Sequence, residues 1–205
     1  MKLKERKNSP MTDILENYLA LTGTLSDEEI NFSADFFKPI SLKRGEFFIR
    51  EGDTCRYIGF IVRGAVKAYA IDEEGKENIT CFKFENEFAT SFPEFVAQEK
   101  SRRSIKVIED SIIYRISYPD YLYLLDQVTA WNNIIRSVIE REYTQKELYL
   151  LHYNNRTAVD KYRHVLMNEP MLIRRVATQD LASYLGITQR SLTRAKGHLH
   201  RSKEL

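Results

Sequence analysis

The stretch from Val176 to Leu199, VATQDLASYLGITQRSLTRAKGHL, constrains the fold of this chain more than any other part of it. Its first half places apolar residues on one face of a short helix, and Gly186 follows where a tight turn needs a residue that tolerates positive φ. Thr178 and Thr188 stand at the expected helix starts, where a hydroxyl can cap an unpaired backbone N–H. The second half repeats apolar residues at spacings of three and four, at Leu192, Ala195 and Leu199. The stretch therefore predicts two short helices joined by a glycine turn.

The outward side of the second predicted helix carries side chains suited to DNA. Arginine can bond both O6 and N7 of guanine, glutamine can bond adenine in the same way, and hydroxyl groups reach phosphates or base edges. Two short helices with such a face form a helix-turn-helix. We therefore assign the following DNA-binding residues: Thr178, Thr188, Gln189, Arg190, Ser191, Thr193, Arg194 and Lys196. The alternative is an ordinary pair of surface helices with a solvated basic face.

The charge distribution favours the DNA-binding interpretation. The whole chain has a formal net charge of only +2. Residues 1–155 carry 21 Lys and Arg against 25 Asp and Glu, whereas residues 156–205 carry 10 against 4. The positive excess thus lies in the segment that holds the predicted helix-turn-helix, as a phosphate-facing module requires.

The segment before this module has the pattern of a β structure. From Ile40 onward, short runs rich in Phe, Ile, Val and Tyr alternate with glycine and charged turns, which predicts an antiparallel barrel or sandwich at about 38–117. Residues 12–37 predict two short helices, with a cap at Ser26. After the long helix discussed next, we expect a hinge at 154–156, a helix over 157–168, and a short strand or turn at MLIRRV, residues 171–176. The predicted fold class is therefore α+β.

A long helix is predicted between the β structure and the hinge. It starts at Pro119 and runs to Tyr153, with apolar residues at steps of three and four. Such a length is typical of a helix that pairs with a partner, and two DNA half-sites need two recognition helices. We therefore assign 119–153 as a dimerisation helix, with Trp131, Ile135 and Val138 at its seam. The alternative is that the apolar stripe only covers the β structure.

Four motifs in this order resemble the CRP/FNR superfamily of bacterial transcription regulators. They are LKRGEFFIREGD (42–53), YIGFIVRGAVKAY (57–69), DEEGKE (72–77) and DLASYLGITQRSLTR (180–194). The resemblance covers about residues 12 to 200. It implies a β-roll (jelly-roll) sensor domain of the cyclic-nucleotide-binding type at 12–118, the dimerisation helix at 119–153 and a helix-turn-helix domain at 154–205. The polar start, 1–11, is expected to be flexible.

The resemblance also implies partners and a location. It implies a cytoplasmic homodimer that binds roughly palindromic double-stranded DNA, with RNA polymerase as a further candidate partner. Two cysteines without a CxxC pair suit a reducing cytoplasm. No apolar run approaches the roughly 20 residues of a membrane span, so no membrane partner is expected.

The chain departs from the family pattern where nucleotide-binding members hold a cyclic phosphate. Those members have a Gly-Glu pair that opens the phosphate-binding cassette, and an Arg-Ser or Arg-Thr pair follows. Here the corresponding residues are Asn86-Glu87 and Ser101-Arg102, with Arg103 next to them. Asparagine adopts an open turn less readily than glycine. We therefore take these five residues as candidates for an effector pocket, but we expect no cofactor, an unknown effector, and no binding of cyclic AMP.

Between these pairs the sequence is aromatic, with Phe88, Phe92 and Phe95 around Pro93. Such a cluster could line a pocket for another ligand, but core packing is the favoured interpretation.

A second departure lies at the end of the sequence. The residues after the recognition helix are too few for the two-stranded wing that follows it in this fold, so we expect the wing to be missing, either naturally or by truncation. A regulator that acts through protein partners, with a degenerate helix-turn-helix, is therefore the alternative function.

An enzyme of the cupin type is the other rival class. That chemistry usually needs histidine ligands inside the barrel. All four histidines lie beyond the predicted barrel, at His152, His164, His198 and His200. We therefore expect no catalytic residue and no metal site.

Overall fold

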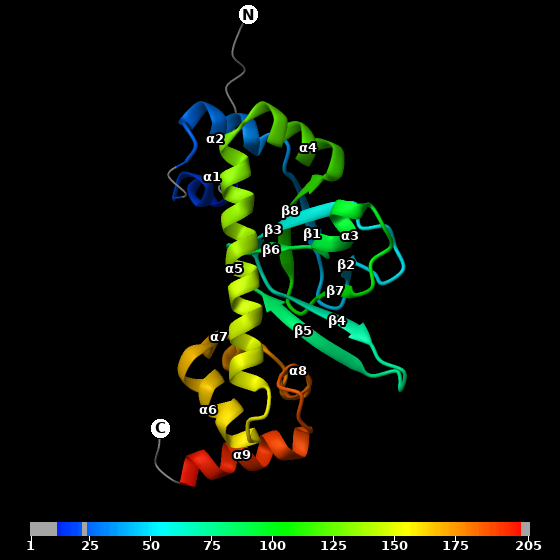
Figure 1. Cartoon of the computed structure of the whole chain (residues 1–205), viewed down its shortest axis with the longest axis vertical. Helices are drawn as coiled ribbons and strands as arrows, with labels where there is room; N and C mark the ends of the chain where they lie inside the picture. Colours follow the sequence, from blue (N-terminus) through cyan, green and yellow to red (C-terminus); the bar gives the residue numbers. More distant parts are fainter. Residues whose placement is uncertain (1–11, 22–23, 202–205) are drawn as a thin grey trace, which may run out of the picture. The chain divides into compact units, whose positions relative to one another are not determined.

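The computed structural model describes residues 12–21 and 24–201 (Figure 1). The predictions of a flexible start at 1–11 and of a missing wing concern segments that lie largely outside these residues. The chain divides into two compact units. The first holds the chain up to Lys67 together with Lys83–Ser137, and the second holds Ala68–Phe82 together with the chain from Val138.

Two short helices precede the strands, as the sequence predicts. They are α1 (Thr12–Leu21) and α2 (Asp27–Ala34). Ser26 caps α2 in a reciprocal capping box, because its hydroxyl accepts from the Glu29 N–H at 3.3 Å while the Glu29 carboxylate accepts from the Ser26 N–H at 2.8 Å. Leu15 and Leu19 of α1 are fully buried in the core of the first unit.

Eight strands lie between Lys38 and Ser117, the interval predicted for the β structure. They are β1 (Lys38–Leu42), β2 (Phe47–Ile49), β3 (Tyr57–Arg63), β4 (Val66–Ile71), β5 (Glu77–Lys83), β6 (Phe88–Ala89), β7 (Ser104–Val107) and β8 (Ser111–Ser117). They form two four-stranded sheets, ordered β1-β8-β3-β6 and β2-β7-β4-β5. The β1–β8, β3–β8, β3–β6 and β2–β7 pairs are antiparallel. The α+β class with an antiparallel β-roll is therefore confirmed.

The core of the first unit shows why one glycine of β3 is required. Gly59 lies opposite Arg115 in the β3–β8 register. A Cβ at Gly59 would come within 2.5 Å of the Ile113 side chain and 2.7 Å of the Phe48 ring. Phe48 belongs to β2 of the other sheet, so this face of β3 and β8 is the interior face of the roll.

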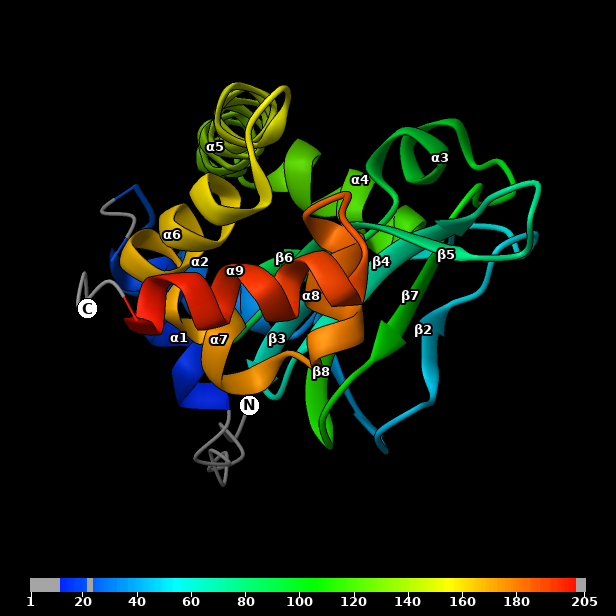
Figure 2. The same cartoon turned by 90° about the horizontal axis from the view of Figure 1, so that it is seen from below.

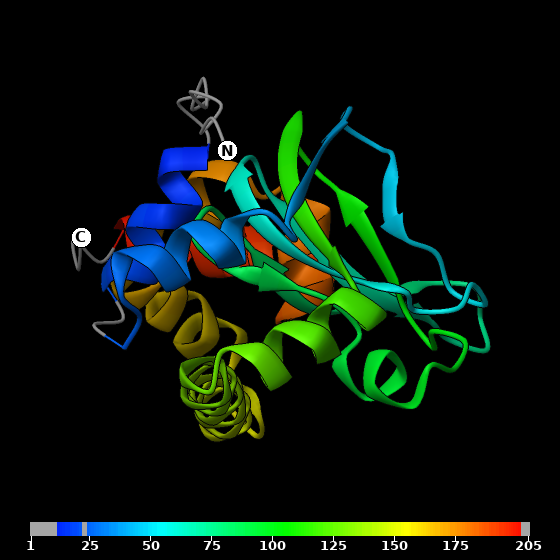
Figure 3. The same cartoon turned by 90° about the horizontal axis from the view of Figure 1, so that it is seen from above.

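The aromatic segment from β6 to the following helix is core packing, which confirms the favoured interpretation. Phe88 packs against Phe60 and Tyr18, with ring centroids 5.2 and 5.8 Å away. Phe95 of α3 (Phe92–Ala97) is fully buried and contacts Tyr118 and Tyr121 edge-on. These tyrosines belong to α4 (Tyr118–Gln127), and Figure 3 shows α3 beside the start of α4.

The predicted helix over 119–153 is two helices, so that prediction is wrong in its continuity. α4 ends at Gln127, and α5 spans Ala130–Tyr153. The break occurs at Val128, whose backbone is extended (φ −126°, ψ 91°) and whose side chain is 4% exposed. Burial of this β-branched side chain accompanies the turn out of the helical path.

The second unit contains the remaining helices. They are α6 (Ala158–Asn168), α7 (Pro170–Arg175), α8 (Thr178–Tyr184) and α9 (Gln189–Arg201). A turn with Asn155 at positive φ (55°) separates α5 from α6, at the predicted hinge. The strand or turn predicted for 171–176 is instead mostly helix α7, because Pro170 starts it at a favoured position and Leu172 is buried. No helix among the described residues is long and apolar enough to cross a membrane.

Candidate functional site

The predicted pair of helices joined by a glycine turn is present in the second unit (Figure 2). Gly186 has φ of +61°, which is the left-handed conformation that the turn needs. The buried face was predicted correctly. Its side chains are at most 3% exposed: Leu181, Ala182, Leu185, Leu192, Ala195 and Leu199.

The two predicted threonine caps differ. Thr188 caps α9, because its hydroxyl oxygen accepts from the Ser191 N–H at 3.1 Å. Thr178 is already inside α8, whose N-cap is Ala177, so the predicted cap there is wrong. The Thr178 hydroxyl instead lies 3.4 Å from the Lys196 ammonium, which also lies 5.7 Å from the Tyr162 ring centroid. Thr178 and Lys196 therefore link α8 to α9.

The outward face of α9 remains accessible. Arg190 and Arg194 are exposed, and neither forms an ion pair with a carboxylate of the described residues. The exposed set also includes Thr188, Gln189 and Thr193, whereas Ser191 and Lys196 are half-buried. The Thr193 hydroxyl donates to the Gln189 carbonyl at 3.0 Å. Unpaired guanidinium groups on one helix face are suited to phosphates and base edges.

The residues assigned to the dimer seam are in different environments. Trp131 is 2% exposed, its indole N–H donates to the Ser33 hydroxyl at 2.7 Å, and its ring stacks on Phe37. Trp131 therefore belongs to the core of the first unit, which corrects its assignment to a partner contact. Ile135 and Val138 are half-buried. Further along α5, exposed apolar side chains follow at Ile139, Tyr143 and Leu150.

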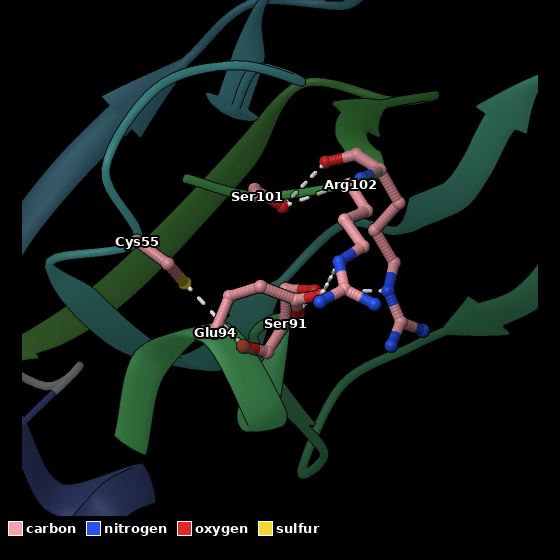
Figure 4. Close-up of polar contacts among 6 residues, drawn as sticks. Cys55, Ser91, Glu94, Ser101 and Arg102 are labelled. Carbon is pink, nitrogen blue, oxygen red and sulfur yellow. Dashed lines mark hydrogen bonds and ion pairs between the residues drawn. The ribbon is translucent and has the colours of Figure 1, made fainter. Parts of the chain in front are cut away.

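Three of the five effector-pocket candidates gather in one polar cluster (Figure 4). The buried Ser101 hydroxyl donates to the Arg103 carbonyl at 2.7 Å. The Arg103 Nε donates to the Ser91 hydroxyl at 2.9 Å. Arg102, whose side chain is 82% exposed, places its Nε 3.7 Å from Oε1 of Glu94.

Glu94 is the anion at the centre of this cluster. Its carboxylate is 5% exposed and accepts from the Ser91 hydroxyl at 2.5 Å. Burial raises the pKa of Glu94, but the Ser91 hydroxyl, a backbone N–H and the nearby guanidinium groups of Arg103 and Arg102 lower it more, so the pKa lies below its ordinary value. The carboxylate therefore occupies, beside two arginines, the kind of position in which an external anion would bind.

The other two candidates lie apart from this cluster. The Asn86 N–H donates to the Ile61 carbonyl at 2.9 Å. Glu87 accepts from the Phe84 N–H at 2.7 Å and from the Lys83 ammonium at 3.4 Å. Among the described residues, no hydrogen bond or ion pair joins Asn86 or Glu87 to the arginines.

The backbone of Asn86 differs from what its residue type predicts. Its φ is +65°, so it does adopt the open-turn conformation that we expected it to resist.

Sequence reasoning missed Ser91 and Glu94. The Ser-x-x-Glu spacing at the start of α3 was the available signal, since it resembles a capping box.

The described residues contain no group of three or more His, Cys, Asp and Glu side chains that could hold a metal ion.

Comparison with known families shows what the β-roll is similar to. The family model of the cyclic nucleotide-binding domain matches residues 39–128. The segment 39–128 is therefore similar to a cyclic nucleotide-binding domain. This family match covers the interval of the strands and α4, and it includes the cluster around Glu94.

Relatives of the whole chain are regulators of the CRP/FNR type, as the four motifs predicted. The fumarate and nitrate reduction regulatory protein of Vibrio cholerae is 22% identical over 201 residues, which are 91% of this chain and 79% of that protein. The structure of FixK2 from Bradyrhizobium japonicum has a TM-score of 0.69 at 18% identity, and the match covers 82% of this chain and 86% of FixK2.

A second structural neighbour gives the same result. The c-di-GMP responsive global regulator CLP of Xanthomonas campestris has a TM-score of 0.69 at 17% identity, and the match covers 89% of this chain and 93% of CLP. The β-roll and the helices that follow it therefore have the fold of these regulators.

Proposed function

We propose that this protein is a sequence-specific DNA-binding transcription regulator that acts as a homodimer in the cytoplasm. The observation that carries the proposal is the division of α9 into two faces. Leu192, Ala195 and Leu199 are buried, while Arg190 and Arg194 are exposed without a carboxylate partner among the described residues. The regulators among its relatives support the same function.

The proposed base-reading residues are Gln189, Arg190 and Arg194, all on the first two turns of α9. Thr188, Ser191 and Thr193 are proposed to contact phosphates or base edges beside them. Lys196 and Thr178 hold α8 and α9 together, so their proposed contribution is to orient the helix rather than to read bases.

The proposed dimer contact lies along α5. It contains three exposed apolar residues, which are Ile139 (42% exposed), Tyr143 (65%) and Leu150 (47%). They follow Ile135 and Val138 at helical spacing, so a second copy of α5 could cover them. A dimer would supply the two recognition helices that a roughly palindromic operator requires.

The cluster around Glu94 supports a regulator that does not respond to cyclic AMP. A cyclic phosphate next to Arg102 and Arg103 would have to compete with a carboxylate that is already buried there. We therefore propose that cyclic AMP is not the effector. RNA polymerase is a proposed further partner, because a regulator bound upstream of a gene acts on the transcribing enzyme.

Selection of random duplex DNA on the purified protein, with and without excess cyclic AMP, tests these proposals. We expect a palindromic motif with half-sites about 10 base pairs apart, equally enriched in both conditions. A motif that appears only with cyclic AMP would contradict the role assigned to Glu94. Failure to enrich any sequence, with binding that is insensitive to salt, would favour the alternative of a regulator that acts through protein partners.

A further inference from the structure

The first unit contains a second group of arginines, which does not include those of the cluster around Glu94. This unit has a cavity of about 500 Å³. Its walls come from β2, the loop that follows β2, the start of β3, and β8. Arg50, Arg56 and Arg115 line it together with Phe48 and Tyr57.

The positive charge of these three arginines is not balanced by negative charge in the lining. Among the described residues, none of them forms an ion pair with a carboxylate. Asp53 is the one acidic side chain in the lining, so the lining carries a net charge of +2. Lys106, whose ammonium lies 5.2 Å from the Phe47 ring centroid, adds to the positive field near the cavity.

Aromatic rings hold two of these arginines in place. The Arg115 guanidinium lies 4.4 Å from the ring centroid of Tyr57, and that of Arg50 lies 4.3 Å from the ring centroid of Phe47. Cation–π contacts orient a guanidinium while leaving its N–H groups free to donate. The arginines are therefore positioned without their hydrogen-bonding capacity being used.

The register of the sheet places Arg115 on the interior face of the roll. Arg115 lies opposite Gly59, on the face that Phe48 of the other sheet covers. A half-buried cation on an interior face is costly unless an anion compensates it. The structure offers a cavity next to this cation, and no carboxylate of the described residues forms an ion pair with it.

We propose that this cavity binds a small organic phosphate monoester. A phosphate monoester carries about −1.5 to −2 charges at neutral pH, which matches the net charge of the lining. Guanidinium groups bond phosphate oxygens in a bidentate manner. Phe48 and Tyr57 provide apolar surface for the organic part, and the volume lies in the range of about 300–1,000 Å³ that is usual for small-molecule sites. Arg102 is not among the lining residues, and binding at this cavity does not depend on DNA binding.

Calorimetric titration of the full chain with phenyl phosphate and with inorganic phosphate tests the proposal. We expect saturable binding of phenyl phosphate, with weaker binding of inorganic phosphate, which lacks the organic part. Arg115→Gln should weaken the binding of phenyl phosphate about tenfold or more, because it removes a charge-assisted contact. Arg56→Gln should also weaken it, and this side chain is exposed, so its loss does not threaten the fold.

Two matched variants serve as controls. Arg63→Gln removes an exposed arginine from β3 that does not line the cavity, and Arg102→Gln removes one from the cluster around Glu94. Both should bind phenyl phosphate as the unmodified protein does. Loss of binding in Arg102→Gln but not in Arg115→Gln or Arg56→Gln would overturn the proposal, as would the absence of binding by the unmodified protein. Equal affinity for both probes would overturn the assignment to an ester.

Discussion

The recognition helix α9 and the cluster around Glu94 use the same side chain in opposite ways. On α9, Arg190 and Arg194 are exposed and have no acidic partner among the described residues. In the cluster, Arg102 and Arg103 lie beside the buried carboxylate of Glu94 and the hydroxyl of Ser91. An arginine is therefore available to an external anion where the fold supplies no internal one.

The largest effect is expected from the buried side of α9. Leu192 is fully buried, so Leu192→Ala should lower the free energy of unfolding of the second unit by about 2–5 kcal/mol and abolish DNA binding. Chemical denaturation followed by circular dichroism measures the loss. The neighbouring exposed variant Thr193→Ala should change stability by about 0.5 kcal/mol or less. Comparable losses in both variants would mean that the two faces of α9 are not distinct.

Two turn glycines, one between β3 and β4 and one between α8 and α9, are expected to differ in how well they tolerate a side chain. At Gly64, which has φ of +98°, a Cβ would lie 2.8 Å from the Ser111 Cα, so backbone would have to move. At Gly186 the nearest atom would be the Lys161 Nζ at 4.0 Å. Gly64→Ala should therefore cost about 2–5 kcal/mol and Gly186→Ala about 1–2 kcal/mol of the free energy of unfolding. The reverse order, measured by thermal unfolding, would contradict this difference.

The exposed arginines of α9 are expected to affect DNA binding without affecting the fold. Arg194→Ala should cost about 1–3 kcal/mol of binding free energy against the selected operator, and little against operators altered at the base pair that it reads. Electrophoretic or fluorescence binding assays measure both. Arg102→Ala is the control from the other region and should leave DNA affinity unchanged. A uniform loss on every sequence would identify Arg194 as a phosphate contact.

The smallest effect concerns the acidity of Glu94. Because its pKa is lower in the folded protein than the ordinary value of 4.5, its ionised form contributes stability above about pH 4.5, and this contribution is lost as the pH falls through the folded-state pKa. Glu94→Gln should cost at most about 1 kcal/mol at pH 7 and flatten the dependence of unfolding free energy on pH below 4.5. Glu99→Gln, at an exposed position, is the matched control and should retain the dependence of the unmodified protein.

Local patterns explain what the sequence predicts well. The helix-turn-helix is encoded within 24 consecutive residues, where apolar spacing and one glycine specify two helices and their buried face. The same holds for the strand interval, because turn residues recur at short, regular distances. In MLIRRV, by contrast, a short apolar run fits a strand as well as a helix, and only the burial of Leu172 and the position of Pro170 decide.

Long-range contacts explain what the sequence does not predict. Trp131 has the spacing of a partner-facing residue, but its indole N–H bonds to Ser33, 98 positions earlier. Glu94 lies in an aromatic segment that reads as core, and its arginines come from a later loop. Periodicity describes which face a residue occupies, but it does not say what covers that face.

The hydroxyl of Ser183 on α8 has a consequence for how the protein behaves at high concentration. It donates to the Glu77 carbonyl at 2.6 Å and accepts from the Ile79 N–H at 3.2 Å, and both groups belong to β5, the outermost strand of its sheet. An outermost strand with free N–H and C=O groups is a template for aggregation. Ser183 thus occupies two backbone groups of this edge, which are then not available to a strand from another molecule.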